Sequence, residues 1–317
     1  MFKLKMIYYI NNNTIYIMTD FKELVPSTKT IISVLNINID IAKVFPLLEI
    51  TNYVFTESKR GRRPKTEKIN NNDNIPDGSI INLEYENEIR GYKKKLKAKT
   101  NRKFFRNTLT VEMFVDGKKM NFKIFTAKEG TGNKTQHPGC KDVHQAEKAL
   151  LFFWEQLNRI ENHYSFIKEE ELSIIFHTVM TNINFNLGFV VNRQKLNDNI
   201  NRFSQYNSML ETNIGHAGTN ITQPITEKIE INDLPKITLK KDGSIQRDIV
   251  TFNDYLDKLP DKQRNLQLNK TRKNTFLVFY SGKTIMSGFV SKYMEDSYYN
   301  FIETINEIRD DIEEKNK

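Results

Sequence analysis

The sequence is poor in cysteine and tryptophan, and it lacks any long hydrophobic run. Of its 317 residues one is cysteine, Cys140, and one is tryptophan. A single cysteine excludes disulfides within the chain, and this scarcity fits a reducing, intracellular setting. No apolar run approaches the roughly 20 residues that a membrane-spanning helix needs. The apolar run at 6–10 is too short for the hydrophobic region of a secretory signal. We therefore expect an intracellular protein with no membrane partner.

Positive charge is concentrated in one segment. The whole chain has a net charge of +9, and residues 59–106 contain 15 Lys or Arg against 6 Asp or Glu, which is also a net +9. A localised cationic block points to a polyanionic partner. The alternative is a solvated insertion that its lysines keep soluble. The stretch GYKKKLKAKTNRK at 91–103 would suit a phosphate-contacting arm.

Similar stretches recur in the two halves of the chain, which indicates an internal repeat. NINIDI at 36–41 returns as NINFNL at 182–187, each time after a strand-like run and before an amphipathic stretch. The segment NTFLVFYSGKTIMSG at 274–288 predicts a β-hairpin, and a related pattern extends from Phe125 to Gly139. Each hairpin leads into an apolar stripe at helical spacing. The stripes are Val143, Ala146, Leu150, Phe153, Trp154 and Leu157, then Met294, Tyr298, Phe301, Ile305, Ile308 and Ile312.

These patterns predict an α+β fold built from two halves, each a sheet with helices on one face. We expect an N-terminal extension at 1–27, a first repeat at 28–160 and a second repeat at 171–315. The first repeat carries a basic insertion at about 58–103, and the second carries an insertion at about 225–273. Two local predictions fall in and around these insertions: a short hairpin at 78–91 and a helix with polar flanks within 240–274.

The second hairpin resembles the TATA-box-binding protein family, particularly its divergent versions in large DNA viruses. An apolar strand ends at Phe279, SGK follows at 281–283, and a second apolar strand ends in SG at 287–288. The first half keeps Phe125 and has GCK at 139–141 before its helix, but it lacks Ser-Gly-Lys. The resemblance extends, with insertions, over about residues 28–315.

The resemblance implies a saddle, in which two α+β halves join into one curved antiparallel sheet with helices on the convex face. In that family the concave face binds and bends DNA through the minor groove. It implies a transcription-initiation factor whose partners are AT-rich double-stranded DNA, a transcription factor IIB-like protein and RNA polymerase. The alternative is a DNA-architectural or replication-associated protein without promoter specificity. The implied location is the host nucleus, a cytoplasmic viral factory or the virion.

The resemblance also implies which residues face DNA. Four positions match the wedges that enter base steps: Phe105, Phe125, His216 and Phe279. Five more match residues that face the groove: Thr30, Ile32, His177, Ile285 and Ser287. Thr30 and His177 stand where the family has asparagines that bond base edges, which favours relaxed sequence specificity. A phenylalanine at a strand end can equally be a core residue, so Phe125 and Phe279 have a structural alternative.

The stretch KRGRRPK at 59–65 resembles an AT-hook, whose Arg-Gly-Arg-Pro core lies in the narrow minor groove of A-tracts. The DNA-contacting residues would be Arg60, Gly61, Arg62, Arg63 and Pro64. The additional arginine makes this copy imperfect. A nuclear-localisation patch and a solvated basic loop are the alternatives.

No catalytic motif stands out in the sequence. His137, Cys140 and His144 have spacing that invites a zinc site, but three ligands without a CxxC pair are too few for a closed one. The sequence has no phosphate-binding Walker loop, dinucleotide fingerprint or nucleophile elbow. We therefore expect a protein that is not an enzyme and has no cofactor and no metal. A nucleic-acid enzyme is the remaining alternative, because the saddle fold also occurs as a module in some glycosylases and nucleases.

Overall fold

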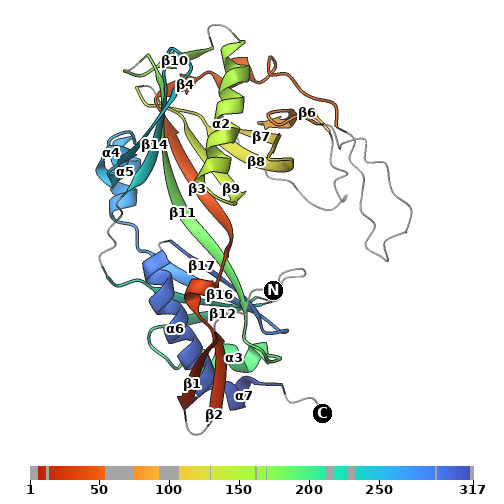
Figure 1. Cartoon of the computed structure of the whole chain (residues 1–317), viewed down its shortest axis with the longest axis vertical. Coiled ribbons are helices and arrows are strands. Elements are labelled where there is room, and N and C mark those ends of the chain that lie inside the picture. Colours follow the sequence, from red (N-terminus) through yellow and green to blue (C-terminus); the bar gives the residue numbers. More distant parts are fainter. Residues whose placement is uncertain are drawn as a thin grey trace, which may run out of the picture. The chain divides into compact units, whose positions relative to one another are not determined.

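The computed structural model is dominated by antiparallel sheet with few helices (Figure 1). It describes residues 6–11, 14–53, 75–92, 107–128, 130–160, 163–168, 170–211, 218–227, 231, 233–289 and 291–314. Within these residues no helix combines the length and the apolar character that crossing a membrane would require. The chain divides into two compact units. Unit 1 comprises 1–29, 178–230 and 268–317, and unit 2 comprises 30–177 and 231–267.

The main strands of unit 2 run in the order β6-β5-β7-β8-β9-β3. Their bounds are β3 (Pro26–Leu35), β5 (Ile80–Tyr85), β6 (Glu88–Gly91), β7 (Thr108–Val115), β8 (Lys118–Phe125) and β9 (Lys134–Cys140). The β5–β6 pairing confirms the hairpin predicted at 78–91. Smaller elements of this unit are β4 (Ile37–Ile39), α1 (Ile41–Val44) and β10 (Tyr164–Phe166).

Helix α2 (Val143–Asn158) confirms the first predicted amphipathic helix. It begins after Asp142, whose carboxylate accepts a hydrogen bond from the Gln145 backbone N–H at 3.0 Å. Its apolar stripe packs on one face of the unit 2 sheet. Phe153 meets Phe122 of β8 edge-on, with ring centroids 5.9 Å apart. Burial of such large apolar side chains is the main favourable contribution to the stability of this unit.

The main strands of unit 1 run in the order β12-β13-β16-β17-β11. Their bounds are β11 (Leu172–Asn186), β12 (Asn207–Glu211), β13 (Gly218–Pro224), β16 (Lys273–Phe279) and β17 (Lys283–Gly288). The β16–β17 pairing confirms the hairpin predicted at 274–288. Further elements of this unit are β1 (Met6–Asn11), β2 (Thr14–Thr19), the 3-10 helix η1 (Phe21–Glu23) and α3 (Arg193–Ile200).

Helix α6 (Ser291–Glu307) packs on the unit 1 sheet. Phe301 stacks on Phe276 of β16 with ring centroids 3.9 Å apart, and both side chains are fully buried. The predicted stripe continues to Ile312, but the helix does not: α6 ends at Glu307 and α7 (Arg309–Ile312) follows. The end of α7 meets the segment before α3, where the Asn192 N–H donates to the Ile312 carbonyl at 2.8 Å.

The segment 231–267 belongs to unit 2, and its structure agrees with the prediction in part. A helix with polar flanks was expected within 240–274. Helices form in this range, which confirms the prediction in part, but as two short ones, α4 (Phe252–Leu256) and α5 (Asp261–Leu268). Before them, β14 (Leu234–Leu239) and β15 (Ile245–Val250) form a hairpin that the sequence did not predict. Gly243 adopts a φ of +84° in the hairpin turn, which favours glycine. Pro260 separates the two helices, since proline lacks the N–H that a continuing helix would use.

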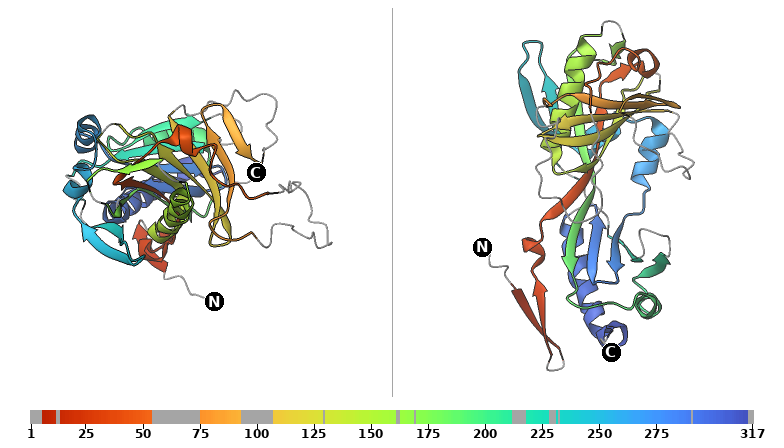
Figure 2. Two further views of the ribbon diagram at one scale, coloured as in Figure 1. Left: turned by 90° about the horizontal axis from the view of Figure 1, so that it is seen from above. Right: turned by 90° about the vertical axis from the view of Figure 1, so that its right-hand side faces the viewer.

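We call α4 and the segment after it, up to Leu259, the insertion cover, because they bury strand residues of unit 2 on the side opposite α2 (Figure 2). Tyr255, Leu256 and Leu259 form a small core with Val34 of β3 and Ile175 of β11. Their neighbours on the strands, such as Leu35 and Ile174, pack in the α2 core instead. Strand residues 172–177 are therefore buried on both faces, which explains why they form a nearly continuous apolar run.

Candidate nucleic-acid interface

The unit 1 sheet has one buried face and one open face. Strand side chains alternate between the two faces, and the register identifies which residues share a side. Ile183, Phe276 and Met286 point toward α6 and are buried. Their neighbours in sequence point the other way and form the unit 1 open face. Its residues are Asn182, Asn184, Asn186, Asn207, Met209, Glu211, Gly218, Asn220, Thr222, Thr275, Leu277, Phe279, Lys283, Ile285 and Ser287.

Side chains on the unit 1 open face form rows across the strands. The central row is Asn184, Ile285, Leu277, Asn220 and Met209, each opposite the next in the register. An adjacent row is Asn182, Ser287, Thr275, Thr222 and Asn207. The face thus combines amides and hydroxyls with aliphatic side chains. Neither row contains a charged residue; Glu211 and Lys283, the charged members of the face among the described residues, stand at strand ends.

Hydrogen bonds hold part of the unit 1 open face in place. The Ser287 hydroxyl donates to Asn182 Oδ1 at 2.8 Å, and Asn182 Nδ2 donates to Thr28 Oγ1 at 3.0 Å. At the other edge, Asn220 Nδ2 donates to Glu211 Oε1 at 3.0 Å. These bonds fix the orientation of two amides. Asn184 is exposed, so its amide can meet a ligand without first breaking a buried contact.

Phe279 stands at the end of β16 on the open face and is half-buried. Its cross-strand neighbour is Gly218, which contributes no side chain beside the ring. A Cβ added to Gly218 would lie 2.8 Å from a methyl carbon of Leu277, so the glycine leaves room for the open-face side chains. Tyr280, the next residue, is 56% exposed. Phe279 therefore places an aromatic ring at this corner of the face.

Three residues predicted from the sequence lie together on this face: Phe279, Ile285 and Ser287. The predicted His216 lies outside the described residues. Sequence reasoning missed Asn184 and Asn220. The sequence could have identified Asn184, because the alternation NINFN in β11 puts every asparagine on the face away from the buried Ile183.

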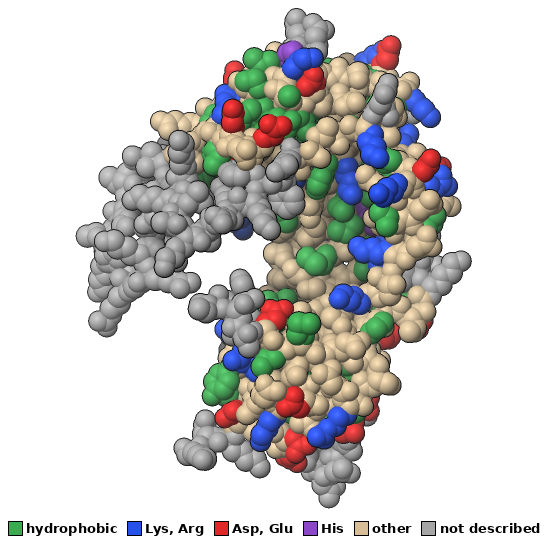
Figure 3. Space-filling model, turned by 180° about the vertical axis from the view of Figure 1, so that it is seen from behind, with side chains coloured by type: hydrophobic (Ala, Val, Ile, Leu, Met, Phe, Trp, Pro, Cys, Tyr) green, Lys and Arg blue, Asp and Glu red, His purple; other side chains and the backbone are tan. Residues whose placement is uncertain are grey.

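The corresponding face of the unit 2 sheet is more highly charged. One row comprises Glu84, Thr110, Lys123 and Gln136. Neighbouring rows contain Glu112 opposite Asn121, Phe114 opposite Lys119, and Phe125 opposite Lys134. The Tyr92 hydroxyl donates to Glu112 Oε1 at 2.6 Å, and burial followed by this carboxylate raises the pKa of Tyr92. Figure 3 shows Lys and Arg side chains interspersed with hydrophobic ones on one face of the molecule.

The predicted groove-facing residues of unit 2 lie under or beside the insertion cover. His177 is 1% exposed and packs against the rings of Phe252 and Tyr255, with centroids 5.4 and 5.2 Å away. Thr30 is 8% exposed, and Ile32 on the same side of β3 is half-buried. Contact of His177 with any ligand would therefore require α4 to move. Their assignment to DNA stays a prediction.

Phe125 ends β8 and is half-buried. The Lys134 ammonium lies 5.7 Å from the centroid of its ring, within the range of a cation–π contact. The other predicted wedge of this half, Phe105, lies outside the described residues, as does the AT-hook-like stretch with Arg60, Gly61, Arg62, Arg63 and Pro64. Most of the basic block at 59–106 also lies outside them.

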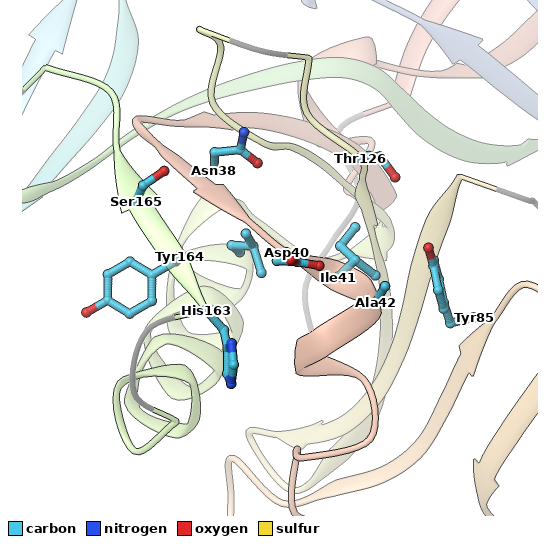
Figure 4. Close-up of a pocket in the computed structure, with 10 residues that line it drawn as sticks. Asn38, Asp40, Ile41, Ala42, Tyr85, Thr126, His163, Tyr164 and Ser165 are labelled. Carbon is cyan, nitrogen blue, oxygen red and sulfur yellow. The ribbon is translucent and has the colours of Figure 1, made fainter.

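A separate hollow of about 530 Å³ lies beside α1 in unit 2. Figure 4 shows Tyr85 of β5 on one side of it and His163 and Tyr164 on the other, with Asp40 and Ile41 between. Asp40 is occupied as a helix cap: its carboxylate accepts from the Lys43 N–H, and it pairs with Lys43 Nζ at 2.8 Å. The hydrogen bond from Lys43 lowers the pKa of Asp40. The carboxylate is thus held ionised in a structural role.

The three residues with zinc-like spacing differ in their surroundings. His137 is fully buried, with Nε2 2.8 Å from Thr135 Oγ1, and burial lowers its pKa to about 3. Cys140 is buried, and burial raises the pKa of its thiol to about 12, so it is an unreactive thiol at neutral pH. His144 is exposed on α2. Among the described residues no group of three His, Cys, Asp or Glu side chains converges as a metal site.

No protein-family model matches the chain, and no curated protein matches it. Among solved structures, a TBP from Methanococcus jannaschii matches with 13% sequence identity, covering 90% of this chain and 98% of that chain, at a TM-score of 0.40. A match at this identity and TM-score assigns no role to any residue of the present chain.

Proposed function

We propose that the protein binds AT-rich double-stranded DNA through the minor groove and acts as a TATA-box-binding-protein-like initiation factor. The observation that carries this proposal is the central row of the unit 1 open face: Asn184, Ile285, Leu277, Asn220 and Met209. Aliphatic side chains fill its middle, and amides stand on both sides of them.

The chemistry of this row suits the minor groove. A·T pairs present only acceptors there, adenine N3 and thymine O2, whereas G·C pairs add the guanine amino group. Asparagine amides donate to such acceptors, and Ile285 and Leu277 can pack against sugars and base edges without needing hydrogen bonds of their own. At the corner, Phe279 has the size and position of a wedge that enters a base step.

The strand orders support the proposal that the chain consists of two related halves. Unit 1 has the order β12-β13-β16-β17-β11, and unit 2 has the order β5-β7-β8-β9-β3, with an additional strand, β6, paired beyond β5. In both orders the strand that comes first in the sequence, β11 or β3, stands last. In each unit a long helix comes directly after the strand that is next to last in this order. Helix α6 follows β17 in unit 1, and helix α2 follows β9 in unit 2. The saddle arrangement, the bending of DNA and the partnership with a transcription factor IIB-like protein and RNA polymerase belong to the proposal through the sequence resemblance. The proposal assigns no catalytic role.

The test is footprinting and affinity measurement on AT-rich and mixed-sequence duplexes, with and without a minor-groove competitor. We expect protection of AT-rich DNA that the competitor removes. Asn184→Ala should weaken binding by roughly tenfold or more, since a good base-edge contact contributes about 1–3 kcal/mol of discrimination.

Asn300→Ala is the matched control. Asn300 is exposed on α6, and its only described hydrogen bond uses the backbone carbonyl, which alanine keeps. Equal losses in both variants would contradict the proposed face. Equal affinity for AT-rich and random duplexes would favour the DNA-architectural function, and base release or strand cleavage would indicate an enzyme.

A further inference from the structure

A second hollow in unit 2, with a volume of about 220 Å³, surrounds Phe125. We call it the Phe125 hollow. Its lining comes from the end of β8, the loop that follows, β3, and the connection between α4 and α5. The lining residues that the following steps use are Val34, Phe125, Lys128, Lys134, Lys258 and Leu259. All of them belong to unit 2.

The walls of the Phe125 hollow combine an aromatic ring with positive charge. Phe125 is half-buried, and Val34 and Leu259 close the apolar side, being 3% and 8% exposed. Among the described lining residues there are three lysines, at 128, 134 and 258, and no carboxylate. Lys134 Nζ lies 5.7 Å from the centroid of the Phe125 ring. A ligand that meets the ring therefore also meets an ammonium group.

Hydrogen bonds and close backbone contacts hold this hollow in shape. Asn133, itself fully buried, donates from Nδ2 to the Phe125 carbonyl at 2.9 Å. Thr131 Oγ1 both accepts from the Lys128 N–H at 3.2 Å and donates to the Lys128 carbonyl at 2.8 Å. Gly132 lies so close to β3 that an added Cβ would fall 1.6 Å from the Leu35 carbonyl oxygen. The loop is thus fixed against the strand before any ligand arrives.

The size of the hollow limits its occupant. Pockets for whole small ligands usually measure about 300–1,000 Å³, so a space of about 220 Å³ suits one unit of a larger molecule. A planar, sequence-tolerant group stacks on an aromatic ring, and lysines meet a phosphate. One nucleotide of a nucleic acid has both groups, a planar base and a phosphate, joined through a single sugar.

We propose that the Phe125 hollow receives a single unstacked nucleotide of the bound DNA, with its base against Phe125 and its phosphate among the lysines. This inference rests on the proposed function. It differs from a wedge: a wedge enters between two bases that stay in the duplex, whereas the hollow takes one base out of the stack. Lys258 and Leu259 come from the insertion cover, so the site depends on that segment.

The first experiment compares a fully paired duplex with one that carries a single unpaired adenine. Extruding a base is least costly when it is already unpaired, so the protein should bind the bulged duplex roughly tenfold more tightly. Phe125→Leu should abolish that preference, and Lys134→Gln with Lys258→Gln should reduce it. Lys241→Ala is the control, because it removes one charge from unit 2 at a lysine that pairs with Glu170 outside the hollow.

Absence of a preference in the unchanged protein, or its persistence in Phe125→Leu, would overturn the inference while leaving DNA binding intact. The Trp154 fluorescence melting curve shows whether each variant is folded, and the lysine pair tests the hollow without touching its apolar wall.

A second experiment separates this inference from the proposed function. Deoxyadenosine monophosphate is titrated into the full chain and followed by NMR line broadening of the nucleotide. Binding that Phe125→Leu abolishes supports the hollow even if no duplex binds. If inorganic phosphate displaced the nucleotide with an affinity equal to that of the nucleotide itself, the hollow would bind only the phosphate, and the proposed role of the base would be wrong. Absence of both duplex and nucleotide binding would overturn the inference together with the function.

Discussion

In unit 1 the strands β12-β13-β16-β17-β11 present an open face whose central rows are amides, hydroxyls and aliphatic side chains, with Glu211 and Lys283 at strand ends. In unit 2 the strands β5-β7-β8-β9-β3 follow the same order but present Glu84, Lys119, Lys123 and Lys134. The insertion cover also occupies part of the second face. The same topology therefore supplies two different surfaces, because strand order sets the positions of side chains and sequence sets their chemistry. Under the proposed function, unit 1 reads the groove and unit 2 adds charge contacts.

The largest expected effect separates the two faces of one strand in unit 1. Phe276→Ala should destabilise the protein by about 3–5 kcal/mol, because it empties a buried site that stacks on Phe301. Phe279→Ala, on the open face, should leave the melting temperature nearly unchanged while it weakens DNA bending in a fluorescence-transfer assay. Circular dichroism melting of both variants provides the comparison. If Phe279→Ala unfolds the protein as readily as Phe276→Ala, Phe279 is a core residue and not a wedge.

A substitution in the insertion cover should weaken its packing on the strands of unit 2 and so expose a sheet face there, as in unit 1. Leu256 is 1% exposed in the core that the cover forms, so Leu256→Ala should cost about 2–5 kcal/mol of stability. It should also accelerate amide exchange in residues 174–177, which the cover protects. Trp154, the single tryptophan, lies in α2 and reports the unfolding of unit 2 by fluorescence. Leu266→Ala on α5, where the side chain is 62% exposed, is the control and should change stability by less than about 0.5 kcal/mol. Unchanged exchange in Leu256→Ala would show that the cover does not protect the strand.

Acid should weaken unit 2 through His137. Burial lowers the pKa of His137 to about 3 in the folded state, against about 6.5 when unfolded, so the unfolded chain binds one more proton between these values. Stability is present in full above pH 6.5 and falls by about 1.4 kcal/mol per pH unit as the pH drops below it. Urea unfolding between pH 7 and 5, followed by Trp154 fluorescence, measures this slope. His137→Gln should flatten it, and a slope that does not change in the variant would assign the effect to other groups.

The smallest expected effect concerns salt. If the charged face of unit 2 contacts phosphates, Lys123→Gln should reduce the slope of log affinity against log salt by about 0.9, the value for one neutralised phosphate. Asn184→Ala on unit 1 should lower affinity without changing the slope. Affinity measured at four salt concentrations distinguishes these outcomes. Equal slopes in both variants would mean that the two faces do not divide their roles in this way.

Local periodicity predicted much of the fold. The hairpin at 274–288 and helix α2 are both encoded in alternation or helical spacing within a few residues, and both form as expected. The sequence did not reveal that 231–267 belongs to unit 2, because a contact between Leu256 and Ile175 has no local signature. For the same reason the burial of His177 could not be foreseen. At the candidate site, motif matching found Phe279 and Ile285 but overlooked Asn184, whose position follows from alternation in the neighbouring strand.

The interleaving of chain segments in the two units has a consequence for synthesis on the ribosome. Unit 2 needs residues 231–267, and unit 1 needs residues up to 317, so neither is complete when the first half of the chain has emerged. Until α4 is made, Val34 and Ile175 lack the apolar partners that later bury them. Contacts between residues so distant in sequence form slowly, and exposed strand surface attracts other chains in the meantime. During synthesis the apolar strand residues Val34 and Ile175 are therefore exposed until the C-terminal half of the chain is made. We expect a chaperone that binds extended apolar segments to raise the yield of folded protein.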